Sequence, residues 1–229
     1  MGGCTEKCIH RFLQIKKNMT LTVTQLVVGQ MAANCYIASD RSTGDALILD
    51  PGDDAGYIID TIARLKVTPV GIILTHGHFD HCMAAFEVQM AYEVPCMLHP
   101  ADMFLLTRMA ETAKHFLGLT HVDPAPHIDI PLGSGQYIAI GESRVQIHEI
   151  PGHTPGSVLI YNKESPLVFV GDVLFDQGAV GRTDHEYSSP QDLATSIRSI
   201  LSYSDATRIY AGHGESTTVG LAKTYRPVA

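Results

Sequence analysis

The stretch THGHFDH, residues 75–81, decides the fold and raises the question of function. It places three histidines and one aspartate within six residues, directly after the apolar run Val70–Leu74. Rigid scaffolds commonly present reactive groups where a buried strand ends. Imidazole and carboxylate groups are good ligands for zinc, iron and manganese. The stretch therefore predicts a metal site that includes His76, His78, Asp80 and His81.

Further ligands are expected at other strand ends, because one loop rarely surrounds an ion alone. Three segments repeat the pattern of an apolar run followed by a glycine and a ligand-type side chain. They are PGHTPGS with His153, GDVLF with Asp172 and GHGESTT with His213. Each residue taken singly could be an ordinary loop, turn or capping residue. Their common context predicts that the three join the cluster at 75–81.

The apolar pattern predicts many short strands and four helices in one α/β (α+β) domain, residues 19–229. Val, Ile and Tyr are frequent in the strand segments, and turn residues bound them. We expect strands at Leu21–Val28, Cys35–Ala38, Ala46–Leu49, Val70–Leu74, Cys96–Leu98, Gln136–Ile140, Arg144–Ile150, Val158–Tyr161, Leu167–Val170 and Arg208–Ala211. Helical spacing marks Ala55–Leu65, Met83–Tyr92, Ala101–Phe116 and Pro190–Tyr203, and residues 118–130 are expected to be a loop. Two mixed sheets covered by helices would satisfy this order.

Composition excludes several classes of protein. A net charge of −8 without a basic run argues against nucleic-acid binding. No apolar run approaches the roughly 20 residues that span a bilayer. Five cysteines without a CxxC pair do not imply a disulfide framework, and we expect a reducing, cytoplasmic location. Residues 1–18 lack the apolar core of a secretory signal and are expected to be a disordered extension. The pair Cys4 and Cys8 alone would make a poor metal site.

The order HGHFDH, His153, Asp172, His213 resembles the metallo-β-lactamase superfamily. The strings GDVLFDQGAVGRTD, residues 171–184, and GHGESTT, residues 212–218, resemble its hydroxyacylglutathione hydrolase (glyoxalase II) branch. The resemblance runs from about Leu21 to Val219. It implies a four-layer αββα sandwich, with two mixed sheets flanked by helices and the metal site at one edge of the sheets. Full-length glyoxalase II enzymes carry an additional C-terminal helical region that contacts glutathione. Only nine residues follow Gly220 here, so the chain is similar to the short, single-domain type of glyoxalase II.

The resemblance also implies two divalent ions, zinc first, with iron or manganese as alternatives. In that scheme the first ion binds His76, His78 and His153. The second binds Asp80, His81 and His213, and Asp172 bridges both. Such a pair of ions lowers the pKa of a shared water toward about 7. The resulting hydroxide would attack the thioester carbonyl of an S-2-hydroxyacylglutathione-type substrate, with Asp80 orienting it or taking a proton later.

Other residues and functions stay open at this point. Asp50 could support a ligand histidine or make a turn before Pro51. Thr154 could bond near the site or build its own turn, and Arg182 could bind a substrate carboxylate or pair with Asp184. A persulfide dioxygenase would instead use one Fe(II), held by His76, His153 and Asp172. A lactonase or another ester or amide hydrolase on the same fold is a further alternative, although the zinc β-lactamases commonly replace the residue at His81 or place a cysteine at Asp172. A protein that only binds metal would retain the same ligands. The expected partner in each catalytic case is a small molecule, and the sequence does not indicate an oligomeric state.

Overall fold

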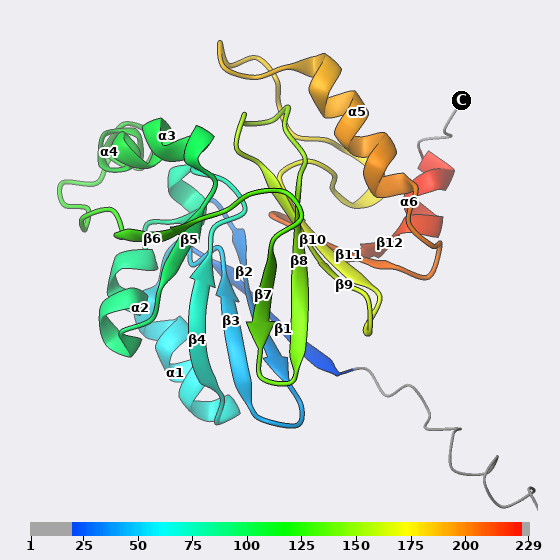
Figure 1. The fold of residues 1–229 in the computed structure, drawn as a ribbon. Helices are drawn as coiled ribbons and strands as arrows, with labels where there is room; N and C mark the ends of the chain where they lie inside the picture. Colours follow the sequence, from blue (N-terminus) through cyan, green and yellow to red (C-terminus); the bar gives the residue numbers. More distant parts are fainter. Residues whose placement is uncertain (1–19, 226–229) are drawn as a thin grey trace, which may run out of the picture.

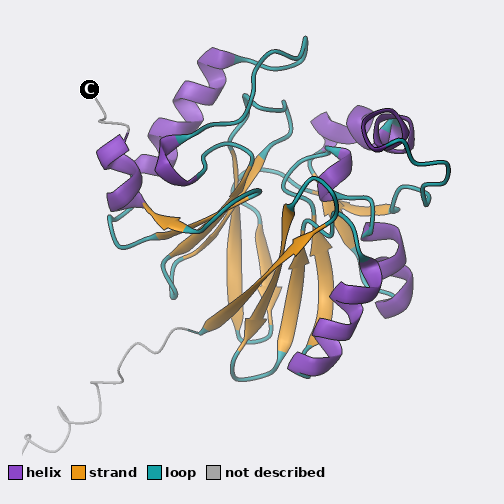
Figure 2. Ribbon diagram, turned by 180° about the vertical axis from the view of Figure 1, so that it is seen from behind, coloured by secondary structure: helices purple, strands orange, loops and turns teal. Residues whose placement is uncertain are grey.

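Two six-stranded sheets face each other in the computed structural model, which describes residues 20–225 (Figure 1). The expected extension 1–18 and the pair Cys4 and Cys8 therefore lie outside the described residues. Helices cover the outer face of each sheet, as the view from behind also shows (Figure 2). This is the predicted αββα sandwich. None of the helices within residues 20–225 is long and apolar enough to cross a membrane.

The first sheet follows the chain order from β1 to β6. Its antiparallel part is followed by three parallel pairings, β3 with β4, β4 with β5 and β5 with β6. The helices α1 (Ala55–Leu65) and α2 (Ala85–Tyr92) connect the parallel strands. The strands are β1 (Leu21–Val28), β2 (Ala33–Asp40), β3 (Asp45–Leu49), β4 (Thr68–Ile73), β5 (Cys96–Leu98) and β6 (Ile128–Pro131).

The second sheet has the order β12-β11-β10-β9-β8-β7 and one parallel pairing, between β10 and β11. The helices α5 (Pro190–Leu201) and α6 (Val219–Tyr225) belong to this half of the chain. Ser189 caps α5, because its hydroxyl accepts from the backbone of Asp192, and Pro190 suits the first helical turn. The strands are β7 (Tyr137–Ile140), β8 (Ser143–Glu149), β9 (Val158–Asn162), β10 (Leu167–Gly171), β11 (Arg208–Ala211) and β12 (Thr217–Thr218).

Three apolar clusters form the core, one between each pair of layers. Ile58 and Ile62 of α1 pack with β2, β3 and β4 in the first cluster. Leu47, Ile147 and Phe169 lie in the second, between the two sheets. The third cluster lies under α5 and α6. Burial on both faces explains why the central strands β3, β9 and β10 are nearly continuous apolar runs.

Two expectations from the sequence need correction. The segment expected as one helix, Ala101–Phe116, is a 3-10 turn followed by α3 (Met103–Thr107) and α4 (Met109–Leu117), with Arg108 between them outside helical geometry. The spacing of the buried residues Leu106, Met109 and Ala113 continues across the break, so apolar periodicity does not reveal it. The expected loop 118–130 is shorter, because β6 begins at Ile128 and pairs with β5.

The carboxyl ends of the central strands meet along one edge of the sandwich. Strands β3 and β4 run in parallel in the first sheet, as β10 and β11 do in the second. The two sheets are joined at this edge, because the backbone N–H of Asn34 donates to the carbonyl of Gly212 at 2.7 Å. This edge therefore collects the loops after β3, β4, β8, β10 and β11, which carry the predicted site residues.

Candidate metal centre

Three histidines form a first group at this edge. His76 and His78 lie in the loop that follows β4, and His153 follows β8. Nδ1 of His78 lies 3.2 Å from Nε2 of His76 and 3.0 Å from Nε2 of His153. One ring nitrogen from each residue thus faces a common point, with all three nitrogens within 4.8 Å of one another.

A second group lies beside the first and contains Asp80, His81 and His213. Asp80 and His81 belong to the 3-10 turn Phe79–His81, and His213 follows β11. Nε2 of His213 lies 3.3 Å from Nε2 of His81 and 3.4 Å from Oδ2 of Asp80. The turn thus supplies two consecutive residues to one group.

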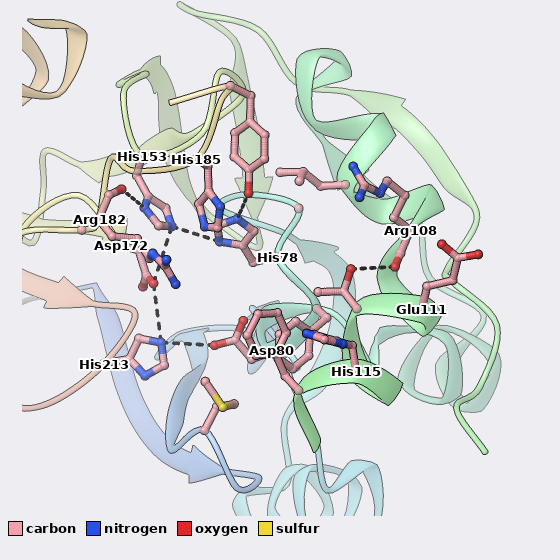
Figure 3. A pocket seen from close by; sticks show the side chains of 18 of the residues that line it. His78, Asp80, Arg108, Glu111, His115, His153, Asp172, Arg182, His185 and His213 are labelled. Atoms are coloured by element: carbon pink, nitrogen blue, oxygen red, sulfur yellow. Dashed lines mark hydrogen bonds and ion pairs between the residues drawn. The ribbon is translucent and has the colours of Figure 1, made fainter. Parts of the chain in front are cut away.

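Asp172, directly after β10, lies between the two groups. Its Oδ1 is 3.4 Å from Nε2 of His81, and its Oδ2 is 3.5 Å from Nε2 of His213. The same Oδ2 lies 3.8 Å from Nε2 of His153 in the first group. Figure 3 shows this carboxylate between His153 and His213. All seven residues predicted from the sequence therefore lie together, and one carboxylate faces both groups.

Each histidine is held from behind by a hydrogen bond on its other ring nitrogen. Nδ1 of His153 donates to the carbonyl of Arg182 at 2.9 Å. The other four pairs are His76 with Thr75, His81 with Asp50, His213 with the carbonyl of Ala32, and His78 with the hydroxyl of Tyr187. A neutral imidazole that donates from one nitrogen keeps a lone pair on the other. The five lone pairs consequently point inward.

This arrangement fits a pair of cations. Five inward lone pairs at separations of 3.0–3.3 Å would repel one another without a positive charge between them. Oδ1 of Asp172 is buried and has no hydrogen-bond partner among the described residues. Buried polar atoms without a partner are rare in native proteins. A divalent cation in each group would satisfy both the nitrogens and this oxygen.

The electrostatics differ between the two groups: the pKa of His76 and of His78 is lowered, which favours neutral imidazoles, whereas the pKa of His81 and of His213 is raised. Burial lowers the pKa of His76 and of His78, the latter to about 3, and neighbouring histidines add to the effect. Burial acts to raise the pKa of Asp172, but contact with His81 outweighs it, and the pKa is lowered. Burial likewise acts against a charge on His81, whereas Asp172 and Asp80 raise its pKa. The two carboxylates therefore favour a positive charge where a cation would sit.

Glycines allow the backbone to approach the ligands closely. A Cβ at Gly212 would collide with Oδ1 of Asp172 and would lie 2.8 Å from a ring carbon of His81. A Cβ at Gly181 would collide with the carbonyl of Asp172 and would lie 2.9 Å from Nδ1 of His153. The glycines noted beside the ligands in the sequence thus include positions where no side chain fits.

The sequence left the roles of Asp50, Thr154 and Arg182 open, and these three residues lie in different places relative to the two groups. Asp50 is buried and contacts His81, so it lies behind a ligand candidate. Thr154 is also buried, and its hydroxyl donates to Oδ2 of Asp102 at 2.7 Å, away from the two groups. Arg182 forms a two-pronged ion pair with Asp184, with both contacts at 2.6 Å, and its side chain lines the pocket over the site.

Asp102 and Tyr187 were not singled out from the sequence. Asp102 is fully buried and accepts from the backbone of Gly77 at 2.9 Å and of Gly156 at 2.7 Å. It therefore ties the loop of His76 and His78 to the loop of His153. Burial raises its pKa, although these donors and Thr154 act in the opposite direction. Neither residue lies in a motif, so only the fold brings them to the site.

A pocket of about 650 Å³ opens over the two groups. His78, Asp80, His153, Asp172 and His213 form its floor, and Figure 3 shows α4 along one side, with Arg108, Glu111 and His115. Its further lining includes Met31, Phe79, Phe116, Phe175, His185 and Tyr187. The pocket is large enough for a small-molecule substrate.

The family model described as the metallo-beta-lactamase superfamily matches residues 28–213, from the end of β1 to the last ligand candidate. The chain belongs to this superfamily. The superfamily fold binds divalent metals, in agreement with the His and Asp groups described above. The resemblance drawn from the motifs is thereby confirmed.

Similar members of the superfamily have different names. The hydroxyacylglutathione hydrolase GloC of Haemophilus influenzae is 35% identical over 196 residues, which cover 85% of this chain and 91% of that protein. The BLEG-1 B3 metallo-beta-lactamase structure is 32% identical, with a TM-score of 0.82, over 90% of this chain and 98% of that one. TTHA1623 in a di-iron-bound form is 33% identical, with a TM-score of 0.80, over 89% and 98%.

Proposed function

We propose that this protein is a metal-dependent hydrolase that cleaves thioesters of the S-2-hydroxyacylglutathione type. The observation that carries the proposal is the presence of two ligand groups side by side, with Asp172 between them. Such a pair suits hydrolysis, because two neighbouring ions can act on both the attacking water and the carbonyl oxygen. The name of the GloC relative supports the choice of substrate.

Each of the two groups would bind one metal ion. In this proposal His76, His78 and His153 hold one ion, Asp80, His81 and His213 hold the other, and Asp172 contacts both. We expect zinc, with iron or manganese as alternatives, since sites rich in histidine and carboxylate accept all three. The bound ions would supply Lewis acidity and would lower the pKa of a water in the site.

Asp80 is the proposed proton acceptor. Its carboxylate lines the pocket, and its Oδ2 is held 3.4 Å from Nε2 of His213. From this place it can orient the attacking water, accept a proton from it and release the proton later. A thiolate leaves without a strong general acid, which is why a thioester suits a site with this residue set.

The test compares Asp80→Ala with Asp60→Ala, a matched change at an exposed position on α1. We expect Asp80→Ala to reduce kcat/KM for S-lactoylglutathione by about a hundredfold or more, with an unchanged circular dichroism spectrum. Asp60→Ala should retain wild-type activity, and wild-type protein purified without chelators should contain two ions per chain. Near wild-type turnover by Asp80→Ala would contradict the role given to the second group.

A second candidate is hydrolysis of a β-lactam, which the 32% identity to the BLEG-1 β-lactamase favours. Parallel assays with a chromogenic cephalosporin and with S-lactoylglutathione distinguish the two substrates.

A protein with a single iron that consumes oxygen with glutathione persulfide would instead be a dioxygenase.

A further inference from the structure

One face of α4, continued by the residue that precedes it, forms a wall of the pocket. Five pocket-lining residues follow the spacing of a single helical face, since they lie at i, i+3, i+4, i+7 and i+8. They are Arg108, Glu111, Thr112, His115 and Phe116. Figure 3 shows three of them, Arg108, Glu111 and His115, on the side opposite His153 and Arg182. A ligand above the metal groups would therefore lie between this wall and the loop that carries Arg182.

The wall carries a guanidinium without a partner. Within residues 20–225, no carboxylate forms an ion pair with Arg108, and its side chain makes no capping bond at the start of α4. Arg182 on the opposite side is different, because Asp184 already compensates its charge at 2.6 Å. Of these two pocket arginines, only Arg108 carries a charge that no carboxylate of the described residues compensates in an ion pair.

The neighbouring residues add a hydrogen-bond donor and apolar area. The hydroxyl of Tyr187 lies 2.9 Å from Nε2 of His78. When that nitrogen donates, the phenolic hydrogen is free for another acceptor. The rings of Phe79 and Phe116 stack with centroids 5.9 Å apart and give the wall an apolar section.

We propose that Arg108 binds a carboxylate of the substrate and thereby selects thioesters that carry a negative charge. This inference rests on the proposed thioesterase function and names the residue that recognises the substrate class. A guanidinium binds a carboxylate through parallel hydrogen bonds, which an ammonium does not reproduce. The carboxylate can belong to the thiol part, as in glutathione, or to the acyl part.

Three substrates and one substitution separate these cases. S-Lactoylglutathione carries carboxylates on the thiol part, S-succinyl-N-acetylcysteamine carries one on the acyl part, and S-lactoyl-N-acetylcysteamine carries none. We expect Arg108→Gln to reduce kcat/KM at least about tenfold for one of the charged substrates, mainly through KM. The neutral thioester should be cleaved as by the wild type. S-Methylglutathione has no acyl group to cleave, so calorimetric titration with it measures binding without turnover. If Arg108 binds a carboxylate of glutathione, the affinity of Arg108→Gln for S-methylglutathione should be lower than that of the wild type.

Two matched variants test the specificity of the effect. Lys114→Gln removes a positive charge from α4 at an exposed position outside the pocket, and kcat/KM should not change. Glu111→Gln removes the negative charge one turn from Arg108, so KM for the charged substrate should fall or stay the same. An equal loss for charged and neutral thioesters in Arg108→Gln, or an equal loss in Lys114→Gln, would overturn the inference while the thioesterase function stands. A wild-type protein that cleaves none of the three thioesters would refute the function itself.

Discussion

The carboxylate of Asp50 holds His81 from behind, with Oδ2 at 3.2 Å from Nδ1 of the imidazole. The same carboxylate accepts from the backbone N–H and the hydroxyl of Thr75, at 2.7 and 2.6 Å. The hydroxyl of Thr75 in turn lies 3.1 Å from Nδ1 of His76. One buried carboxylate therefore orients a histidine in each of the two ligand groups.

Substitution of Asp50 should consequently weaken metal binding in both groups. Asn is the suitable replacement, because Asp50 has a φ of 49°, a left-handed conformation that Asn tolerates better than Ala. We expect Asp50→Asn to lower the affinity for zinc by about 10- to 100-fold, as substitutions behind metal ligands commonly do. Competition with a chromophoric chelator measures the affinity. Two sites of wild-type affinity in the variant would show that Asp50 only shapes its turn.

Asp102 should contribute mainly to stability. Asp102→Ala would leave the buried N–H groups of Gly77 and Gly156 without an acceptor and would remove a partner of Thr154. Each unsatisfied buried donor costs about 1–3 kcal/mol, so we expect a loss of about 3 kcal/mol in the free energy of unfolding. Urea unfolding in the presence of chelator measures this loss separately from metal binding. The exposed Asp60→Ala serves as control and should change the unfolding free energy by no more than about 0.5 kcal/mol.

The close approach at Gly212 predicts a large effect from a single methyl group. Gly212→Ala would push Asp172 away from both groups, because the new Cβ collides with its Oδ1. We expect less than one ion per chain by elemental analysis and loss of hydrolysis. Gly56→Ala is the matched control, since nothing lies within 4 Å of a Cβ there and alanine favours a helix. Full metal content in Gly212→Ala would mean that the edge of the sheet adapts more freely than the packing suggests.

Asp40 predicts a dependence of stability on pH that is independent of the metal centre. Burial acts to raise its pKa, but donors from Ser42, Ser143 and Thr43 outweigh it and lower the pKa well below the usual range. A lowered pKa in the folded state stabilises the protein fully above the unfolded value of about 3.9, and this stabilisation is lost gradually as the pH falls from there toward the folded pKa. Asp40→Asn should therefore destabilise the protein most at pH 6 and somewhat less at pH 3, because part of the contribution is lost between the unfolded and the folded pKa. Urea unfolding of both proteins with chelator tests this, and an equal difference at the two pH values would refute the assignment.

The residues of the two ligand groups were accessible from the sequence because their signals are local. An apolar run, a glycine and a ligand-type side chain are neighbours in the chain, and a buried strand must end where polar residues begin. The same reasoning predicts the two sheets, whose central strands β3, β9 and β10 are nearly continuous apolar runs because both faces are covered. The family follows from the order of these motifs.

The tertiary structure decided what holds and covers these residues. The partners of His153, His213 and His78 are the carbonyls of Arg182 and Ala32 and the hydroxyl of Tyr187, which lie 29, 181 and 109 positions away. A backbone carbonyl is present in every residue, so no motif marks the one that a histidine contacts. The break between α3 and α4 likewise follows from packing and not from apolar spacing, and it is at this break that Arg108 reaches the pocket. The identity of the candidate ligands is thus encoded along the chain, whereas their orientation and the wall of the pocket depend on two sheets meeting at one edge.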